Sequence, residues 1–155
     1  MTLLFRTSRF AYMHLLLGIV LTLGLLGGST GYAEQKVTLG PYDVHYVLVP
    51  STFFSEQIAE RYEIVRGRDR AVMNISVLND AGAAVPVVIT GSMINLLSQQ
   101  FPLEFAPIEE GDAIYYLAPV RHTDRETLRF QLSITPPDGV TREFDFQQEM
   151  FWDDR

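Results

Sequence analysis

The sequence predicts an all-β protein: an antiparallel β-sandwich of the immunoglobulin-like or fibronectin-III-like type, with one short helix. Two observations lead to this prediction. Short segments alternate apolar and polar residues with period two, and Gly, Pro, Asn and Asp separate one segment from the next. About seven short strands joined by regular turns are typical of a sandwich. A small β-barrel is the alternative fold.

The alternation is clearest toward the C-terminus. Residues 128–135 place four apolar side chains on one face, and residues 142–148 resume the pattern after the turn residues 136–139. We therefore expect these two segments to pair as a hairpin. Five further segments are expected to be strands: residues 42–49, 70–78, 85–90, 103–105 and 113–120.

A single short helix is expected over residues 55–62. Ser55 is a good N-cap residue and Glu56 suits the positive end of a helix. Residues 93–97 fit either a helical turn or a strand. The capping-box pattern from Thr123 to Glu126 gives way to the strand pattern that follows it.

The first 33 residues have the layout of a secretory signal peptide. A short basic start is followed by the apolar residues 10–26 and then by small residues, with Gly31 and Ala33 at positions −3 and −1. We expect cleavage between Ala33 and Glu34, which leaves one domain over residues 34–155. The alternative is an uncleaved signal that anchors the protein in the inner membrane.

Charge and cysteine content exclude several functions. Removal of the signal peptide leaves ten basic and nineteen acidic residues, a net charge of −9, which argues against nucleic-acid binding. The absence of cysteine excludes disulfides, thiolate metal sites and lipoprotein anchoring. We expect no stable membrane span after cleavage of the signal.

Few residues qualify as candidates for chemistry. His45 and His122 are the only histidines after residue 33. Asp43 and His45 would share one strand face, and Asp112 or His122 could complete a metal site with them. Scattered histidines are usually surface or hydrogen-bonded residues, so no metal is expected. Ser92 follows a glycine but lacks the second glycine of a nucleophile elbow, and this stretch is interpreted as a bend between strands.

The remaining motifs have structural interpretations. Residues 109–112 concentrate carboxylates without the spacing of a calcium loop, which favours a solvated turn. Asn74 begins a glycosylation triplet but lies in the middle of an expected strand. The chain has neither a phosphate-binding loop nor a dinucleotide fingerprint, so no cofactor is expected.

Two features beside expected strands each have two possible interpretations. Arg66, Arg68 and Arg70 form either a patch for an anion or a partner, or solvated ion pairs with Glu63, Asp69 or other neighbours. Trp152 either clips the last strand to the fold or marks an exposed contact.

Three stretches carry a resemblance to a known family. Residues 42–46 (YDVHY), 69–77 (DRAVMNISV) and 110–118 (EGDAIYYLA) resemble the DUF4426 family of small exported gammaproteobacterial proteins with no established function. The resemblance implies the periplasm of a Gram-negative cell. It supplies no catalytic residues.

The expected function is that of a periplasmic, non-enzymatic binding module of the cell envelope, with another envelope protein as its partner. The alternative is a periplasmic hydrolase with a dispersed histidine or carboxylate site. A deep pocket lined by His45, His122 or clustered carboxylates would favour the hydrolase. No catalytic, cofactor-binding or metal-binding residue is assigned.

Overall fold

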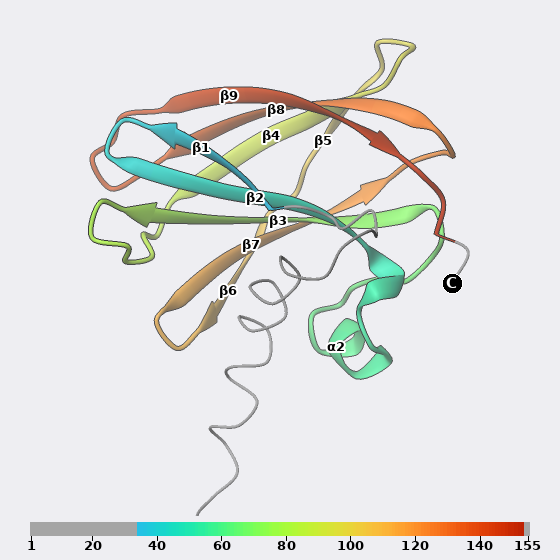
Figure 1. The fold of residues 1–155 in the computed structure, drawn as a ribbon, viewed down its shortest axis with the longest axis horizontal. Helices are drawn as coiled ribbons and strands as arrows, with labels where there is room; N and C mark the ends of the chain where they lie inside the picture. The colour runs from blue at the N-terminus through green and yellow to red at the C-terminus, as the bar shows by residue number, and fades with distance from the viewer. Residues whose placement is uncertain (1–33, 154–155) are drawn as a thin grey trace, which may run out of the picture.

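Two antiparallel β-sheets pack face to face in the computed structural model, which describes residues 34–153 (Figure 1). The first sheet has the order β1 (Gln35–Leu39), β2 (Tyr42–Pro50), β3 (Arg70–Asn79), β7 (Ala113–Arg121), β6 (Ala106–Glu110). The second has the order β5 (Gln100–Pro102), β4 (Val88–Ile94), β8 (Glu126–Thr135), β9 (Arg142–Met150). The expected sandwich is confirmed, whereas the signal peptide lies outside the described residues.

The inner faces of both sheets form the core, as the alternation predicts. In β8 the four predicted inward residues are at most 2% exposed: Leu128, Phe130, Leu132 and Ile134. In β9 Phe146 lies opposite Phe130, and the two rings stack with their centroids 4.9 Å apart. The predicted hairpin is therefore present, with Phe130 and Phe146 both on the inner face as predicted.

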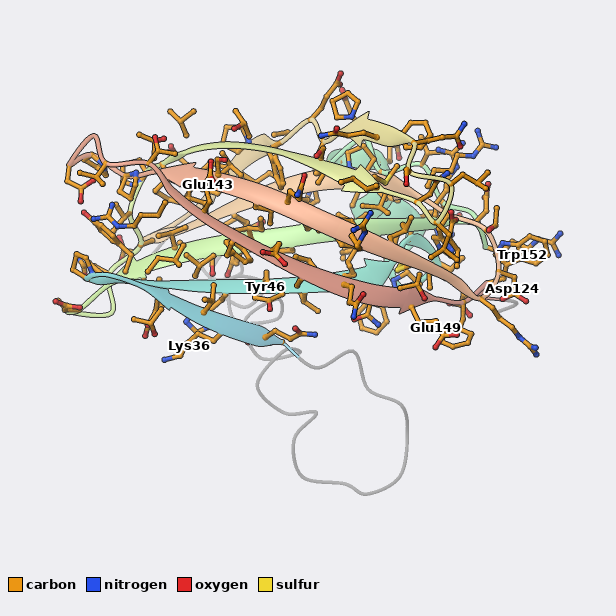
Figure 2. The ribbon with its side chains drawn as sticks, turned by 90° about the horizontal axis from the view of Figure 1, so that it is seen from above. Lys36, Tyr46, Asp124, Glu143, Glu149 and Trp152 are labelled. Carbon is orange, nitrogen blue, oxygen red and sulfur yellow. The ribbon has the colours of Figure 1, made fainter. Side chains whose placement is uncertain are left out.

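Tyr46 of β2 joins the two sheets through aromatic contacts. Its ring centroid lies 5.3 Å from that of Phe144 and 4.5 Å from that of Phe146, both on β9 (Figure 2). Such pairs contribute about 0.5–1.5 kcal/mol beyond the area that they bury. The sheets are thus linked by side chains contributed from strands far apart in the sequence.

The prediction of a strand over residues 103–105 is wrong. This segment carries the chain from the second sheet to the first, between β5 and β6. Leu103 is buried and Phe105 packs against the core, so the apolar pattern reflects the burial of a crossover. The sequence reading also missed β1, an edge strand whose residues are mostly exposed and polar.

The interpretation of a bend at Gly91 is also wrong, because β4 runs straight through this residue. Gly91 lies opposite Leu132 of β8. A β-carbon at position 91 would collide with the Leu132 side chain and would lie 2.8 Å from the carbonyl oxygen of Gln131. The glycine is needed for close approach between two strands rather than for a turn.

The short helix expected over residues 55–62 is present, with Ser55 as its N-cap. A short 3-10 helix η1 (Ser51–Phe53) precedes α2 (Glu56–Arg61), and the Ser55 hydroxyl caps α2 by accepting from the Ile58 N–H at 3.3 Å. Residues 93–97 divide between the end of β4 and a turn. Within residues 34–153 no helix is long and apolar enough to cross a membrane.

Candidate functional site

One end of the sandwich brings together segments that are distant in the sequence. The last residues of β2 and β9 meet the first residues of β3 there, together with η1, the loop over residues 62–69 and the loop over residues 122–125 (Figure 1). Residues 151–153 follow β9 and cross this end as a short terminal segment. We call residues 151–153 the C-terminal strap.

The C-terminal strap is held by hydrogen bonds to three other segments. The Asp153 N–H donates to the Arg68 carbonyl at 3.2 Å, and the Thr52 hydroxyl donates to the Asp153 carboxylate at 2.5 Å. The Trp152 N–H donates to the Asp124 carboxylate at 3.0 Å, and Figure 2 shows these two residues side by side. Of the two alternatives for Trp152, the structure therefore supports a clip that holds the end of the last strand to the fold, although the residue also remains 38% exposed.

The three clustered arginines have different partners. The Arg68 guanidinium lies over the Trp152 ring, 4.1 Å from its centroid, and one Arg66 nitrogen lies 3.7 Å from the Glu56 carboxylate. Arg70 is 4.0 Å from the carboxylate of Asp69. Each of the three arginines therefore has a partner within the fold, and the ion pairs of Arg66 and Arg70 are with Glu56 and Asp69 rather than with Glu63.

Asp69 fixes the geometry of the loop that carries these arginines. Its carboxylate lies 3.2 Å from Arg121, and its carbonyl accepts from the N–H of His122 at 3.0 Å. Desolvation raises the pKa of Asp69, but the hydrogen bond from Arg121, a backbone hydrogen bond and the nearby Arg70 outweigh it, and the pKa lies below its ordinary value. The loop is therefore tied to the end of β7.

Large apolar side chains are exposed at the same end. Phe53 of η1, Phe151 and Trp152 all expose a third or more of their surface. Together with Arg66 and Arg68 we call these residues the Arg/aromatic end. Trp152 and the arginines were recognised from the sequence, but Phe53 was not. No sequence pattern indicated the short helix η1 that places Phe53 at this end.

A buried serine supports this surface from beneath. Ser51 is fully buried; its hydroxyl donates to the Gly67 carbonyl at 3.1 Å and accepts from the Gly67 N–H at 2.9 Å. The Arg66 guanidinium also donates to the Thr52 carbonyl at 3.3 Å. These bonds lock the arginine loop against η1, so the Arg/aromatic end is held in one arrangement.

The two histidines are far apart and have separate partners. His45 lies on β2 with its Nδ1 atom 2.9 Å from the Glu34 carboxylate, whereas His122 follows β7, is 6% exposed and lies 3.0 Å from the Thr123 carbonyl. His45 lies opposite Ser76 and His122 is level with Asp69, so seven residues along β3, about 23 Å, separate the two histidines. They are too distant to share one ion.

The other metal-site candidates do not gather around either histidine. Asp43 forms an ion pair with Lys36 at 2.9 Å and accepts from Thr38 at 2.7 Å; these hydrogen bonds lower the pKa of Asp43. Asp112 lies in the turn between β6 and β7. Among the described residues, no three His, Asp or Glu side chains are placed to hold a metal ion.

The acidic turn over residues 109–112 has a structural role. Glu109 and Glu110 end β6, and Gly111 adopts a φ of 60° in the turn. The Tyr62 hydroxyl donates to the Glu110 carboxylate, and burial followed by this bond raises the pKa of Tyr62. The carboxylate therefore links the segment after α2 to β6.

Two hollows lie on the outer face of the second sheet, with volumes of about 290 and 350 Å³. Both include Gln131 and Asp145, and the larger one also includes Glu143. All three of these side chains are exposed, and neither hollow is lined by a histidine. Ser92 is a buried polar residue that lines the larger hollow, and its hydroxyl accepts a hydrogen bond from the Gln100 side chain at 2.8 Å. Without a histidine in the lining, this serine has no general base that would activate it as a hydrolase nucleophile.

Asn74, the first residue of the glycosylation triplet, lies in the middle of β3 between β2 and β7. Its side-chain oxygen is buried and has no hydrogen-bond partner. An acceptor for a glycan must be accessible on a surface loop, so the structural interpretation of this triplet is supported.

The fold and its features define a small antiparallel β-sandwich with an exposed arginine and aromatic surface at one end. A family model described as a domain of unknown function, DUF4426, matches residues 36–153. The chain belongs to the DUF4426 family. None of the curated proteins matches it.

Solved structures agree with this assignment. A DUF4426 family protein from Pseudomonas aeruginosa is 33% identical, with a TM-score of 0.71 over 78% of this chain and 97% of that chain. FetP of uropathogenic Escherichia coli, expressed recombinantly in the periplasm, is 11% identical, with a TM-score of 0.58 over 81% of this chain and 100% of that one. A copper-bound FetP variant is similar, with 11% identity and a TM-score of 0.57 over 78% of this chain and 97% of that one. The likeness to FetP extends to the fold alone.

Proposed function

We propose that this protein is an exported, periplasmic, non-enzymatic module that binds another envelope protein through its Arg/aromatic end. The signal-peptide pattern over residues 1–33 supports export. The likeness of the fold to FetP, which was expressed in the periplasm, supports the same compartment. The partner is expected to offer an apolar surface rimmed by carboxylates.

The exposure of aromatic rings beside arginines carries this proposal. Tryptophan, tyrosine and arginine dominate the energetically important positions of protein interfaces, and aromatic residues in general are enriched there. Phe53, Phe151 and Trp152 supply the apolar area, and Arg66 and Arg68 supply charge-assisted donors. The hydrogen bonds of the C-terminal strap hold these groups in place before binding, which lowers the entropic cost of association.

The arginines of the Arg/aromatic end interrupt an otherwise acidic surface. The chain after residue 33 carries a net charge of −9, so an acidic protein is repelled by most of its surface. Arg66 and Arg68 offer a local exception. Attraction between these arginines and carboxylates of the partner would therefore help to orient the partner on this end.

Export is tested by N-terminal sequencing of protein from a periplasmic extract. The expected sequence begins Glu34-Gln35-Lys36. Intact Met1 in the membrane fraction would contradict cleavage and would favour the anchored alternative.

Binding is tested with the double variant Phe53→Ser/Arg66→Glu, compared with Arg129→Glu on the outer face of the second sheet. Arg68 is left intact because its contact with Trp152 supports the fold. Partners captured by wild-type protein are identified, purified and titrated at low and high salt. The double variant should keep its melting temperature and lose affinity at least about tenfold, whereas Arg129→Glu should keep both. Equal affinity of the double variant and wild type would refute the role of the Arg/aromatic end.

A further inference from the structure

The turn between β4 and β5 exposes two adjacent leucines. The hairpin extends beyond the body of the sandwich at the upper right of Figure 1, and residues 95–99 form its tip. Leu96 is 75% exposed and Leu97 is 79% exposed. They are more exposed than any other large apolar side chain in residues 34–153.

Asn95 organises the tip through its side chain and its backbone. Its side-chain oxygen accepts from the N–H groups of Leu97 at 3.0 Å and Gln99 at 2.9 Å. Its own N–H donates to the Gln99 carbonyl at 3.1 Å, and its carbonyl accepts from the Ser98 N–H at 3.0 Å. Four of the five backbone N–H groups of the tip therefore have partners within the tip.

Internal hydrogen bonding of this kind lowers the free-energy cost of transferring a turn from water to an apolar phase. A backbone N–H that enters an apolar medium without a partner costs several kcal/mol, and the tip avoids that cost at these four groups. Residues 81–103 contain no charged side chain, so no ionised group on the hairpin has to be desolvated. The leucines can thus move from water into an apolar phase with the turn unchanged.

The nearest cation by strand register lies at the base of the hairpin. Arg129 of β8 is opposite Ile94, the last residue of β4. Arg129 is exposed and lines the smaller hollow together with Ile94. Its guanidinium is therefore placed behind the leucines, where the phosphates of a bilayer lie when an apolar tip enters the acyl boundary.

We infer that the β4–β5 tip docks on a phospholipid bilayer, with Leu96 and Leu97 entering the boundary between headgroups and acyl chains and Arg129 meeting lipid phosphate. A projecting apolar tip needs no matching cavity in a bilayer, whereas a protein partner would have to supply one. The hollows on the second sheet are lined largely by polar side chains and do not offer such a cavity for a second copy of this chain.

The expected binding is weak and reversible. Two leucine side chains bury less apolar area than a myristoyl chain, which alone gives an association constant of only about 10⁴ M⁻¹. The net charge of −9 opposes binding to anionic lipid. Zwitterionic vesicles should therefore bind the protein at least as well as anionic ones.

This inference uses only the export part of the proposed function. The tip and the Arg/aromatic end have no residue in common, so their variants test them separately. Failure to recover the protein from the periplasmic extract would count against export, whereas failure of recovered protein to bind vesicles counts against the tip.

The first test is vesicle flotation with protein purified from the periplasmic extract. The probes are vesicles of phosphatidylcholine alone and of phosphatidylcholine mixed with phosphatidylglycerol. The variant Leu96→Ser/Leu97→Ser should keep the melting temperature and lose about tenfold or more in partitioning. The control Val88→Ser, at a residue that is 65% exposed at the opposite end of β4, should float like wild type.

The second test uses the absence of cysteine from the chain. An environment-sensitive dye on Leu97→Cys should shift to the blue with phosphatidylcholine vesicles, and the same dye on Val88→Cys should not. The Arg129→Gln variant should lower partitioning into both kinds of vesicle without changing the dye shift of the bound fraction. This second reading stands even if the double serine variant folds poorly.

Any of four results would overturn the inference. Wild-type protein that does not float, or that floats equally with Leu96→Ser/Leu97→Ser, has no lipid-binding tip. Equal dye shifts at positions 97 and 88 would mean unspecific adsorption. A dimer in sedimentation that Leu96→Ser/Leu97→Ser abolishes would mean that the tip contacts a second copy instead.

Discussion

The guanidinium carbon of Arg68 lies 4.1 Å from the centroid of the Trp152 ring and joins the loop before β3 to the last residues after β9. The contact is reinforced by the hydrogen bond from the Asp153 N–H to the Arg68 carbonyl. Two segments separated by more than eighty residues in the sequence thereby close one end of the sandwich. The same contact leaves part of the Trp152 ring facing solvent, where it contributes to the Arg/aromatic end.

Replacement of Trp152 should show how much the C-terminal strap stabilises the fold. Trp152→Ala removes both the ring packing and the cation–π contact, so we expect the free energy of unfolding to fall by about 1–3 kcal/mol. Phe151→Ala removes a more exposed neighbour and should change it by less than about 0.5 kcal/mol. Urea unfolding of the two variants measures the difference, and equal losses would show that Trp152 does not clip the strap.

A charged substitution on each face of β8 tests which of its side chains point into the core. Phe130 is fully buried, whereas the next residue, Gln131, is exposed on the opposite face of the sheet. Phe130→Asp should unfold the domain because it places an unpaired carboxylate in the core. Gln131→Asp should leave the circular dichroism spectrum and the melting temperature nearly unchanged. A folded Phe130→Asp variant with wild-type stability would mean that the assigned face is wrong.

The close approach at Gly91 makes a specific prediction for a small substitution. A methyl group at this position meets the Leu132 side chain and the Gln131 carbonyl, so Gly91→Ala should cost about 1–3 kcal/mol of unfolding free energy. Thr90→Ala, at the preceding exposed position, provides the matched control. Thermal unfolding of both variants decides the matter; a neutral Gly91→Ala would show that β4 and β8 can separate without cost.

The turn between β8 and β9 should make stability depend on acidity. Two nitrogens of Arg142 donate to the Asp138 carboxylate at 3.1 and 2.8 Å, and this hydrogen bonding lowers the pKa of Asp138 below its ordinary value of 3.8. A lowered pKa in the folded state means that folding favours the ionised carboxylate. The stabilisation is complete above the ordinary pKa and is lost as the pH falls through the lower folded value.

Arg142→Gln removes the main cause of this pKa shift. Melting temperatures measured from neutral to strongly acidic pH should show a smaller acid-dependent loss of stability in this variant than in wild type. Arg129→Gln, which leaves the turn intact, should follow the wild-type profile. Parallel profiles for wild type and Arg142→Gln would show that the Asp138–Arg142 pair does not contribute to acid sensitivity.

The sequence predicted those strands whose two faces differ in polarity. In β3 and β8 one face packs on the core and the other meets a more polar environment, so period-two alternation reports the facing directly. Prediction failed for β1, β5 and β6, because short edge strands are exposed on most positions and lack the contrast between faces. The segment over residues 103–105 was misread because a buried crossover is as apolar as a buried strand.

The sequence by itself determined the composition of the candidate surfaces: an arginine cluster, a terminal tryptophan, and a long uncharged stretch that contains two adjacent leucines. Only the tertiary structure decided how they are used. Strand pairing placed Phe53, Arg68 and Trp152 at one end, since their segments are joined by hydrogen bonds across the fold rather than by sequence proximity. The exposure of Leu96 and Leu97 was likewise invisible to periodicity, because it follows from the hydrogen bonds of Asn95 and from the position of the turn beyond the sandwich.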